Sequence, residues 1–143
     1  NPISGLKPDV ITRGNRLLVD EFNRVKGYDN IFAIGDVALM EGDEKFPKGH
    51  PQMAPPAQQQ GRLVAKNIRN LISGAPLKPF RYFDKGSMAT VGRNKAVVDM
   101  GKIRFQGFFA WYVWMFVHLM AIVGWKNRVF TFFSWMWSYL TYD

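Results

Sequence analysis

The spacing of apolar residues in the first half of the chain predicts short strands joined by turns. Residues 9–11 and 17–19 are short, largely apolar triplets set among Gly, Asn and Pro, which is typical of strands and turns. Residues 31–34 form a continuous apolar run that ends in Gly35-Asp36, a pattern that favours a strand buried on both faces of a parallel sheet. The polar segment 38–51 contains two Gly and two Pro and is predicted to be a loop.

A helix is predicted from Pro55-Pro56 to residue 71 or 72. Proline is tolerated in the first turn of a helix, and Gly74 is a common helix stop. Small and apolar residues recur with a 3.6-residue period and form one stripe, and polar or cationic residues form the opposite one. The first stripe consists of Ala57, Gly61, Val64, Ala65, Ile68 and Ile72, and the second of Gln58, Arg62, Lys66 and Arg69.

The second half of the chain has two patterns. After Pro76 and Pro79, short antiparallel strands are predicted at 80–83, 87–91, 96–100 and 103–105. Two apolar helices follow, at 107–123 and 128–141, with a hairpin turn at 124–128. The sequence therefore predicts an α/β part at 1–74, a small antiparallel β segment at 75–106 and an amphipathic helical hairpin at 107–143.

The charges are distributed unevenly, which narrows the function classes. The net charge is +8, and residues 62–104 alone carry ten Lys and Arg against two Asp. The five Trp all lie after residue 104, in a tail with only three charged residues. Cations and aromatic residues are therefore not interleaved, which argues against a nucleic-acid surface. The absence of cysteine excludes a disulfide scaffold and a thiolate metal site, so redox chemistry would need a bound cofactor.

The tail favours a membrane surface over a membrane crossing. Its first helix offers sixteen to eighteen apolar residues, fewer than the roughly 20 needed to span a bilayer. Polar residues of the second helix lie on one side, as in helices that lie in the interface. The residues expected to contact lipid are Trp111, Trp114, Lys126, Arg128, Trp135 and Trp137. A buried helical hairpin in a soluble core remains the alternative. We expect no metal site, and His118 is interpreted as a packing residue.

Two features point to ligand chemistry. An Asp at the carboxyl end of a parallel strand lies where open α/β sheets bind ligands, so Asp36 is a candidate acceptor for sugar or ribityl hydroxyls, and Gly35 would let a ligand approach the main chain. The alternative is an Asp that caps a turn. The start of the 55–72 helix carries partial positive charge, which would stabilise an anionic ring or oxygen beyond it.

Taken together, residues 31–38 and 54–68 resemble the second half of the FAD-binding domain of type II NADH dehydrogenases, the single-chain, non-pumping NADH:quinone oxidoreductases. Residues 107–111, 117–119, 126–128 and 135–141 resemble the carboxyl-terminal membrane region of the bacterial members. The resemblance implies that Gly35, Asp36, Ala57 and Gln58 bind FAD. It also implies that Gln59 lies at the quinone pocket, and the sequence has Pro55 where many members carry a second glutamine.

The sequence contains no Gly-x-Gly-x-x-Gly, whereas this family has two such turns, one for FAD and one for NADH. The resemblance therefore implies a carboxyl-terminal fragment, inactive alone, of an FAD-dependent enzyme that transfers electrons from NADH to quinone. We expect a peripheral (monotopic) location on the cytoplasmic side of the cell membrane. We also expect a homodimer formed through an unpaired sheet edge. The alternative is a non-enzymatic adaptor that binds anionic lipid through its basic segment and its aromatic hairpin.

Overall fold

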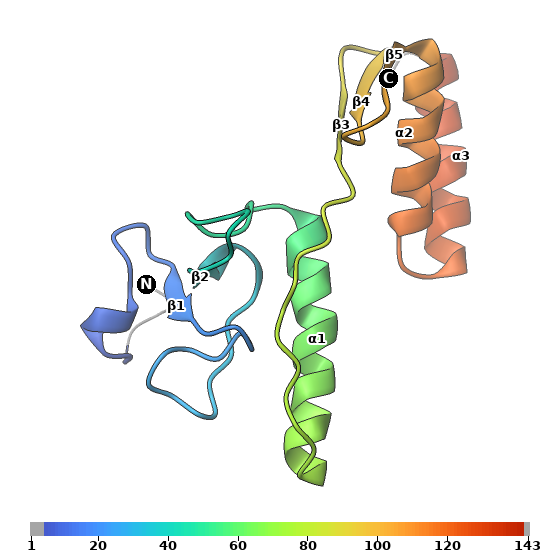
Figure 1. Ribbon diagram of the computed structural model, residues 1–143. Coiled ribbons are helices and arrows are strands. Elements are labelled where there is room, and N and C mark those ends of the chain that lie inside the picture. Colours follow the sequence, from blue (N-terminus) through green and yellow to red (C-terminus); the bar gives the residue numbers. More distant parts are fainter. Residues whose placement is uncertain (1–4, 142–143) are drawn as a thin grey trace. The chain divides into compact units, whose positions relative to one another are not determined.

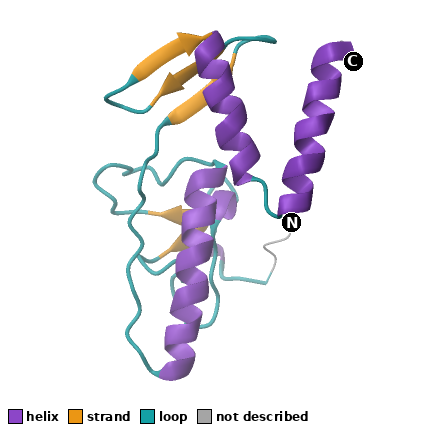
Figure 2. Cartoon of the chain, turned by 90° about the vertical axis from the view of Figure 1, so that its right-hand side faces the viewer, coloured by secondary structure: helices purple, strands orange, loops and turns teal. Residues whose placement is uncertain are grey.

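The computed structural model describes residues 5–141, which form a mixed α/β fold with three α-helices and two small sheets (Figures 1 and 2). The chain divides into two compact units, Asn1–Asp84 and Lys85–Asp143. We call them unit 1 and unit 2. The domain boundaries at 74/75 and 106/107 remain predictions.

The sheet of unit 1 has two parallel strands, β1 (Leu17–Val19) and β2 (Ala38–Met40), and Leu17 pairs with Ala38. The strand predicted at 17–19 is confirmed. The strands predicted at 9–11 and 31–34 are wrong. Residues 8–10 form a 3-10 helix, η1 (Pro8–Val10), and in the two predicted segments Ile11 and Phe32 form isolated bridges to Leu17 and Arg24. A second 3-10 helix, η2 (Gly35–Val37), follows, and β2 begins where a loop was predicted. The core contains eight buried hydrophobic residues, Val10, Leu17, Val19, Val25, Ala33, Ala38, Met40 and Phe80.

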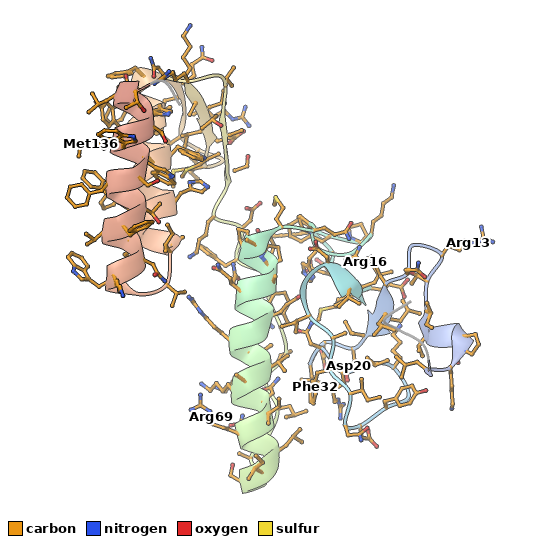
Figure 3. The ribbon with its side chains drawn as sticks, turned by 180° about the vertical axis from the view of Figure 1, so that it is seen from behind. Arg13, Arg16, Asp20, Phe32, Arg69 and Met136 are labelled. Atoms are coloured by element: carbon orange, nitrogen blue, oxygen red, sulfur yellow. The ribbon has the colours of Figure 1, made fainter. Side chains whose placement is uncertain are left out.

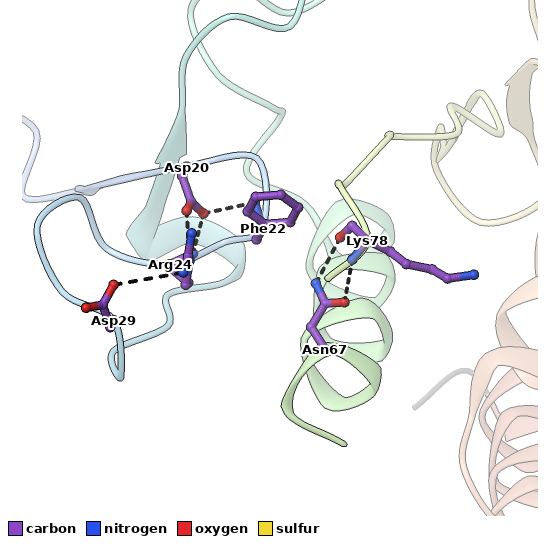
Figure 4. A network of polar contacts seen from close by, with 6 residues as sticks. All are labelled: Asp20, Phe22, Arg24, Asp29, Asn67 and Lys78. Carbon is purple, nitrogen blue, oxygen red and sulfur yellow. Dashed lines mark hydrogen bonds and ion pairs between the residues drawn. The ribbon is translucent and has the colours of Figure 1, made fainter. Parts of the chain in front are cut away.

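The turn after β1 explains why residues 31–34 do not form a strand. The Asp20 carboxylate accepts the main-chain N–H groups of Phe22 and Arg24, both at 2.9 Å, and forms an ion pair with the Arg24 side chain (Figure 4). This places Asn23, which is fully buried, opposite Ala33. The Asn23 amide donates to the Ala33 carbonyl at 3.1 Å, and the Ala33 N–H donates to the Asn23 carbonyl at 3.0 Å. The predicted strand is therefore paired with a turn.

Helix α1 (Ala54–Ser73) confirms the predicted helix and its stop. Gly74 adopts the left-handed conformation, with φ +71°, and the N–H groups of Gly74 and Ala75 bond to the last carbonyls of the helix. The buried face differs from the predicted stripe, since Ile68 and Ile72 are 41% and 83% exposed. The buried residues are Pro56, Gln60, Val64 and Asn67. Two amides occupy this face because each finds hydrogen-bond partners there.

The segment 75–84, which we call the strap, runs back along α1 (Figures 1 and 2). The Asn67 side chain donates to the Lys78 carbonyl and accepts the Lys78 N–H, both at 2.9 Å (Figure 4). The Gln59 side chain pairs in the same way with Phe83, at 2.9 and 3.0 Å. The strand predicted at 80–83 is wrong, because side-chain amides of α1 take main-chain bonds that a neighbouring strand would otherwise supply.

Unit 2 combines an antiparallel sheet with two helices. The strands β3 (Ser87–Thr90), β4 (Ala96–Asp99) and β5 (Arg104–Gly107) are adjacent in chain order, close to their predicted positions. Helices α2 (Phe108–Ala121) and α3 (Trp125–Thr141) follow. Buried Ala96 and Val98 of β4 pack against Ala110 of α2. Among residues 5–141, every helix is too short or too polar to cross a bilayer.

Candidate functional site

Gly35 holds the η2 turn against the start of α1. Its φ is +66°, and a Cβ at this position would lie only 3.1 Å from the Cβ of Ala57. The Gly35 N–H also donates to the Gln60 side-chain oxygen at 2.6 Å, and Gln60 is 2% exposed. The glycine therefore permits close approach of helix α1, while close approach of a ligand stays a prediction.

Asp36 lies on this η2 turn and is exposed. It does not follow a parallel strand, so that part of the expectation is wrong. The Gln52 side chain donates to the Asp36 carbonyl at 3.3 Å, which ties the turn to the segment just before α1. The anchored turn therefore presents the Asp36 carboxylate to solvent, where it can accept hydrogen bonds from a ligand.

The first turn of α1 offers fewer main-chain donors than expected. Pro55 and Pro56 have no N–H, and the Ala57 N–H bonds to the carbonyl of Met53 at 3.4 Å. The Met53 cap position supplies no side-chain cap. The start of α1 therefore has the positive end of the helix dipole but few main-chain N–H groups to donate to a ligand. The exposed Gln58 side chain is a further polar group at this end of the helix.

Gln59 is half-buried, and both the nitrogen and the oxygen of its side-chain amide form hydrogen bonds with the strap. One N–H and one oxygen lone pair remain after the two bonds to Phe83, because an amide has two of each. Gln60 was missed by the sequence reasoning, although its spacing from Pro56 and Val64 places it on their face of the helix. That spacing is the signal by which it can be found.

A second cluster that the sequence did not reveal surrounds His50, which is 4% exposed. Its Nε2 lies 3.0 Å from Asp43 Oδ2. Three aromatic rings enclose it, with centroids at 5.4 Å for Phe46, 5.1 Å for Phe80 and 5.7 Å for Tyr82. Two of the rings come from the strap, so only the folded chain brings the cluster together. It fixes the loop that leads into α1.

The surroundings of this cluster shift two pKa values. Burial alone would raise the pKa of Asp43, but hydrogen bonds from His50 and from main-chain N–H groups such as that of Lys45 lower it below its usual value. Burial and then the charge of Asp84 raise the pKa of Tyr82. The described residues contain no group of three or more metal-ligating side chains.

The helices of unit 2 expose an unusually large apolar surface. Among the most exposed side chains of the helices and of the link between them are Phe109, Phe116, Val123, Trp125, Phe130, Trp137 and Leu140, each more than 60% exposed. Of the six residues predicted to contact a membrane, Lys126 and Trp137 are exposed. Arg128 donates to the Ile122 carbonyl at 2.7 Å and so caps the end of α2.

The other three predicted membrane residues face the space between α2 and α3. Trp111 lies 5.6 Å from Tyr139, and Trp114 lies 6.0 Å from Trp135, as measured between ring centroids. Between the helices is a cavity of about 670 Å³, which we call the α2–α3 groove. Its lining residues are Arg93, Trp111, Tyr112, Trp114, Met115, Phe132, Trp135, Met136, Ser138 and Tyr139.

A basic surface lies on α1. Arg62, Lys66, Arg69 and Asn70 line a shallow cavity of about 550 Å³, and Arg69 extends away from the β1–β2 sheet (Figure 3). Helix α1 contains no acidic residue, so this surface is positively charged.

Comparison with known proteins identifies close relatives. Residues 85–141 match the family described as the NDH2 C-terminal domain. Type II NADH:quinone oxidoreductase NdhA of Mycobacterium tuberculosis is 39% identical over 134 residues, which cover 91% of this chain and 27% of that protein. The enzyme Ndh of the same organism is 38% identical over 92% of this chain and 27% of its own length. The chain thus spans about a quarter of the length of these relatives.

A solved structure has the same fold. The structure of NDH2 from Plasmodium falciparum in complex with NADH matches 86% of this chain and 39% of its own, with a TM-score of 0.74 and 19% identity. The family match begins at the first residue of unit 2, and the sequence similarity extends into unit 1. The chain is therefore homologous to the C-terminal region of type II NADH:quinone oxidoreductases, and its residues 85–141 match the NDH2 C-terminal domain.

Proposed function

We propose that this chain forms the C-terminal part of an FAD-dependent NADH:quinone oxidoreductase. The observation that carries the proposal is the 38–39% identity, over nine-tenths of the chain, to two enzymes named type II NADH:quinone oxidoreductases. In this proposal unit 1 supplies part of the flavin and quinone sites, and unit 2 binds the membrane. The chain alone is inactive, because it lacks glycine-rich turns for FAD and NADH.

The residues around the start of α1 suit a flavin nucleotide. Asp36 is exposed on a turn that Gly35, Ala57 and Gln60 fix to the helix, so its carboxylate is held in place for hydroxyl groups. The positive end of α1 and the exposed Gln58 side chain would favour an electron-rich ring. Bound FAD would supply the electron-carrying chemistry that side chains cannot.

Gln59 is proposed to contact the quinone while it holds the strap. Its remaining N–H is suited to donate to a quinone carbonyl, since the bonds to Phe83 leave that hydrogen free. The bonds to the strap would fix the orientation of the amide, which reduces the entropy lost when quinone binds.

Unit 2 is proposed to lie on the cytoplasmic membrane surface as a monotopic anchor. The exposed rings of α2 and α3 are the kind of side chain that favours the lipid headgroup region, and Lys126 would approach anionic lipid. A homodimer remains part of the proposal, since β2 is an edge strand that pairs with β1 alone among residues 5–141. Light scattering without detergent tests it, and a monodisperse monomer would contradict it.

The flavin assignment is tested by Asp36→Ala in the full-length protein. Loss of charge-assisted hydrogen bonds would cost about 1.5–3 kcal/mol, so FAD should bind roughly ten- to a hundredfold more weakly. Asp9→Ala is the matched control, because Asp9 is also exposed on a 3-10 turn of unit 1. Flavin content after extensive dialysis is the measurement, and equal content in both variants would refute the assignment.

A second function is favoured by the basic surface on α1 and the exposed aromatic surface on unit 2. A membrane adaptor would bind anionic vesicles yet need no cofactor. The two functions separate in one preparation of the full-length protein. Flavin and NADH-dependent quinone reduction support the enzyme, whereas vesicle binding without either supports the adaptor.

A further inference from the structure

The α2–α3 groove belongs entirely to unit 2 and is open between two helices that meet through few ring contacts. At about 670 Å³, it falls within the range of cavities that hold small organic ligands, about 300–1,000 Å³. Trp111 and Trp114 lie on the α2 side, and Trp135 lies on the α3 side. These side chains were assigned to the membrane surface by sequence, and the structure turns them toward the groove.

The walls of the groove are suited to a flexible apolar chain. Eight of the ten lining residues are aromatic or Met, and Met115 and Met136 stand on opposite helices (Figure 3 labels Met136). Methionine has an unbranched, polarisable side chain that adapts to irregular apolar ligands. The lining contains no carboxylate and no amide side chain, and most of its polar atoms are hydroxyl or N–H groups at the ends of large apolar rings.

The polar lining residues without an aromatic ring are Arg93 and Ser138. The Arg93 guanidinium donates to the main-chain carbonyls of Ser138 and Tyr139 and lies 5.2 Å from the Tyr139 ring centroid. These bonds hold a permanently charged group at the wall of an apolar cavity. Residues 85–143 contain seven Lys and Arg against Asp99 and Asp143, so the unit as a whole attracts anions.

We propose that the α2–α3 groove holds one acyl chain of an anionic phospholipid, with the phosphate on the side of Arg93. The exposed rings of both helices would bring the groove to the lipid surface, where acyl chains are the most abundant apolar ligands. The bound acyl chain fills the space between the two helices and makes the lipid an integral part of unit 2. This inference rests on the proposed membrane binding of unit 2 and needs no flavin or quinone chemistry.

The test uses vesicles of phosphatidylcholine with one-fifth phosphatidylglycerol. The full chain is bound to them, released by mild detergent and analysed by native mass spectrometry. We expect one retained phospholipid per chain, enriched in phosphatidylglycerol. Met136→Trp should fill the groove and lower retention at least fivefold, and the deeper Met115→Trp serves as a second filling variant. Circular dichroism checks that each variant is folded.

Phe130→Ala is the matched control, because Phe130 is 77% exposed and does not line the groove. It should weaken vesicle sedimentation and keep the retained lipid, whereas Met136→Trp should do the reverse. Arg93→Gln should reduce the preference for phosphatidylglycerol over phosphatidylcholine toward one.

Three results would overturn the proposal: no retained lipid in the unmodified chain, equal loss of lipid in Phe130→Ala and Met136→Trp, or full retention in both filling variants. A detergent-stable dimer without lipid would assign the groove to a second copy of the chain. Failure of all vesicle sedimentation would instead refute the membrane part of the proposed function. A separate titration with soluble dihexanoyl-phosphatidylglycerol, below its micelle concentration, then decides on the groove itself: saturable binding lost in Met136→Trp supports it, and no binding refutes it.

Discussion

Replacing Asn67 with alanine removes the amide that pairs with both main-chain groups of Lys78. Asn67 is fully buried, and both hydrogen bonds measure 2.9 Å. Each bond contributes about 0.5–1.5 kcal/mol net, so the pair is worth about 1–3 kcal/mol. Lys78 is exposed, so water can reach its main chain once the amide is gone, while the small cavity at position 67 adds to the loss. We expect the free energy of unfolding to fall by about 2 kcal/mol.

The matched control is Asn70→Ala. Asn70 lies one turn further along α1, and its side chain makes a single bond to the strap, to the Pro76 carbonyl at 2.8 Å, at an exposed position. We expect a loss below about 1 kcal/mol for this variant. Urea unfolding followed by circular dichroism measures both values, and an unchanged dependence on urea concentration shows that the unfolded state is the same.

Hydrogen exchange gives a second, local measurement. The Lys78 N–H is protected by the Asn67 side chain, so in Asn67→Ala it should exchange much faster. The Phe80 N–H bonds to the Glu21 carbonyl at 2.7 Å, and its protection should fall only as far as the global stability falls. If Asn67→Ala costs no more than Asn70→Ala, or if the Lys78 amide stays protected, the pairing does not hold the strap and our reasoning is refuted.

Three further predictions concern other parts of the chain. Gly86→Ala should destabilise unit 2 by about 2–4 kcal/mol, because φ is +87° and a Cβ there would overlap the main chain at the end of β4. The control Gly101→Ala, with φ +78° and open space around it, should cost about 1 kcal/mol, and thermal unfolding compares the two variants. The pKa of Asp43 is lower in the folded protein than its value of 3.8 in the unfolded chain, so the ionised carboxylate adds to the free energy of unfolding at a pH above 3.8. This added stability is lost as the pH falls through the lower pKa of the folded state. The stability difference between the unmodified chain and Asp43→Asn, which weakens the contact with His50, should therefore shrink below about pH 4 in urea titrations. Gln59→Ala in the full-length protein should slow flavin oxidation by quinone and leave flavin reduction by NADH nearly unchanged in stopped flow. Equal slowing of both would make Gln59 a structural or flavin-contacting residue instead.

Local sequence signals predicted the elements whose ends are set by their own residues. Helix α1 begins at a pair of prolines and ends at Gly74, and both signals act within one turn. The three strands of unit 2 alternate with turns, and their register follows from neighbouring segments. These elements were predicted within a few residues.

Elements that depend on distant partners were not predictable in this way. Residues 31–34 are apolar enough for a strand, but Asn23 takes the main-chain bonds of Ala33 that a strand would need. Gln60 and Asn67 are polar, so a hydrophobic pattern assigns them to solvent, although each is buried with a main-chain partner from another segment. Gly35 and Asp36 were candidates from the sequence pattern, and the resemblance assigned them to FAD together with Ala57 and Gln58. Their arrangement around the start of α1 came only from the structure.

The amides of α1 recognise the strap through its main chain, so they do not select its side chains. Gln59 and Asn67 are eight residues apart, about 12 Å along the helix axis. The five steps between consecutive residues from Lys78 to Phe83 can span up to about 17 Å, and four steps could still span about 13 Å, whereas three could reach only about 10 Å. The two amides therefore place no requirement on the side chains at 78 and 83, and as far as reach alone is concerned the segment between them could lose one residue but not two.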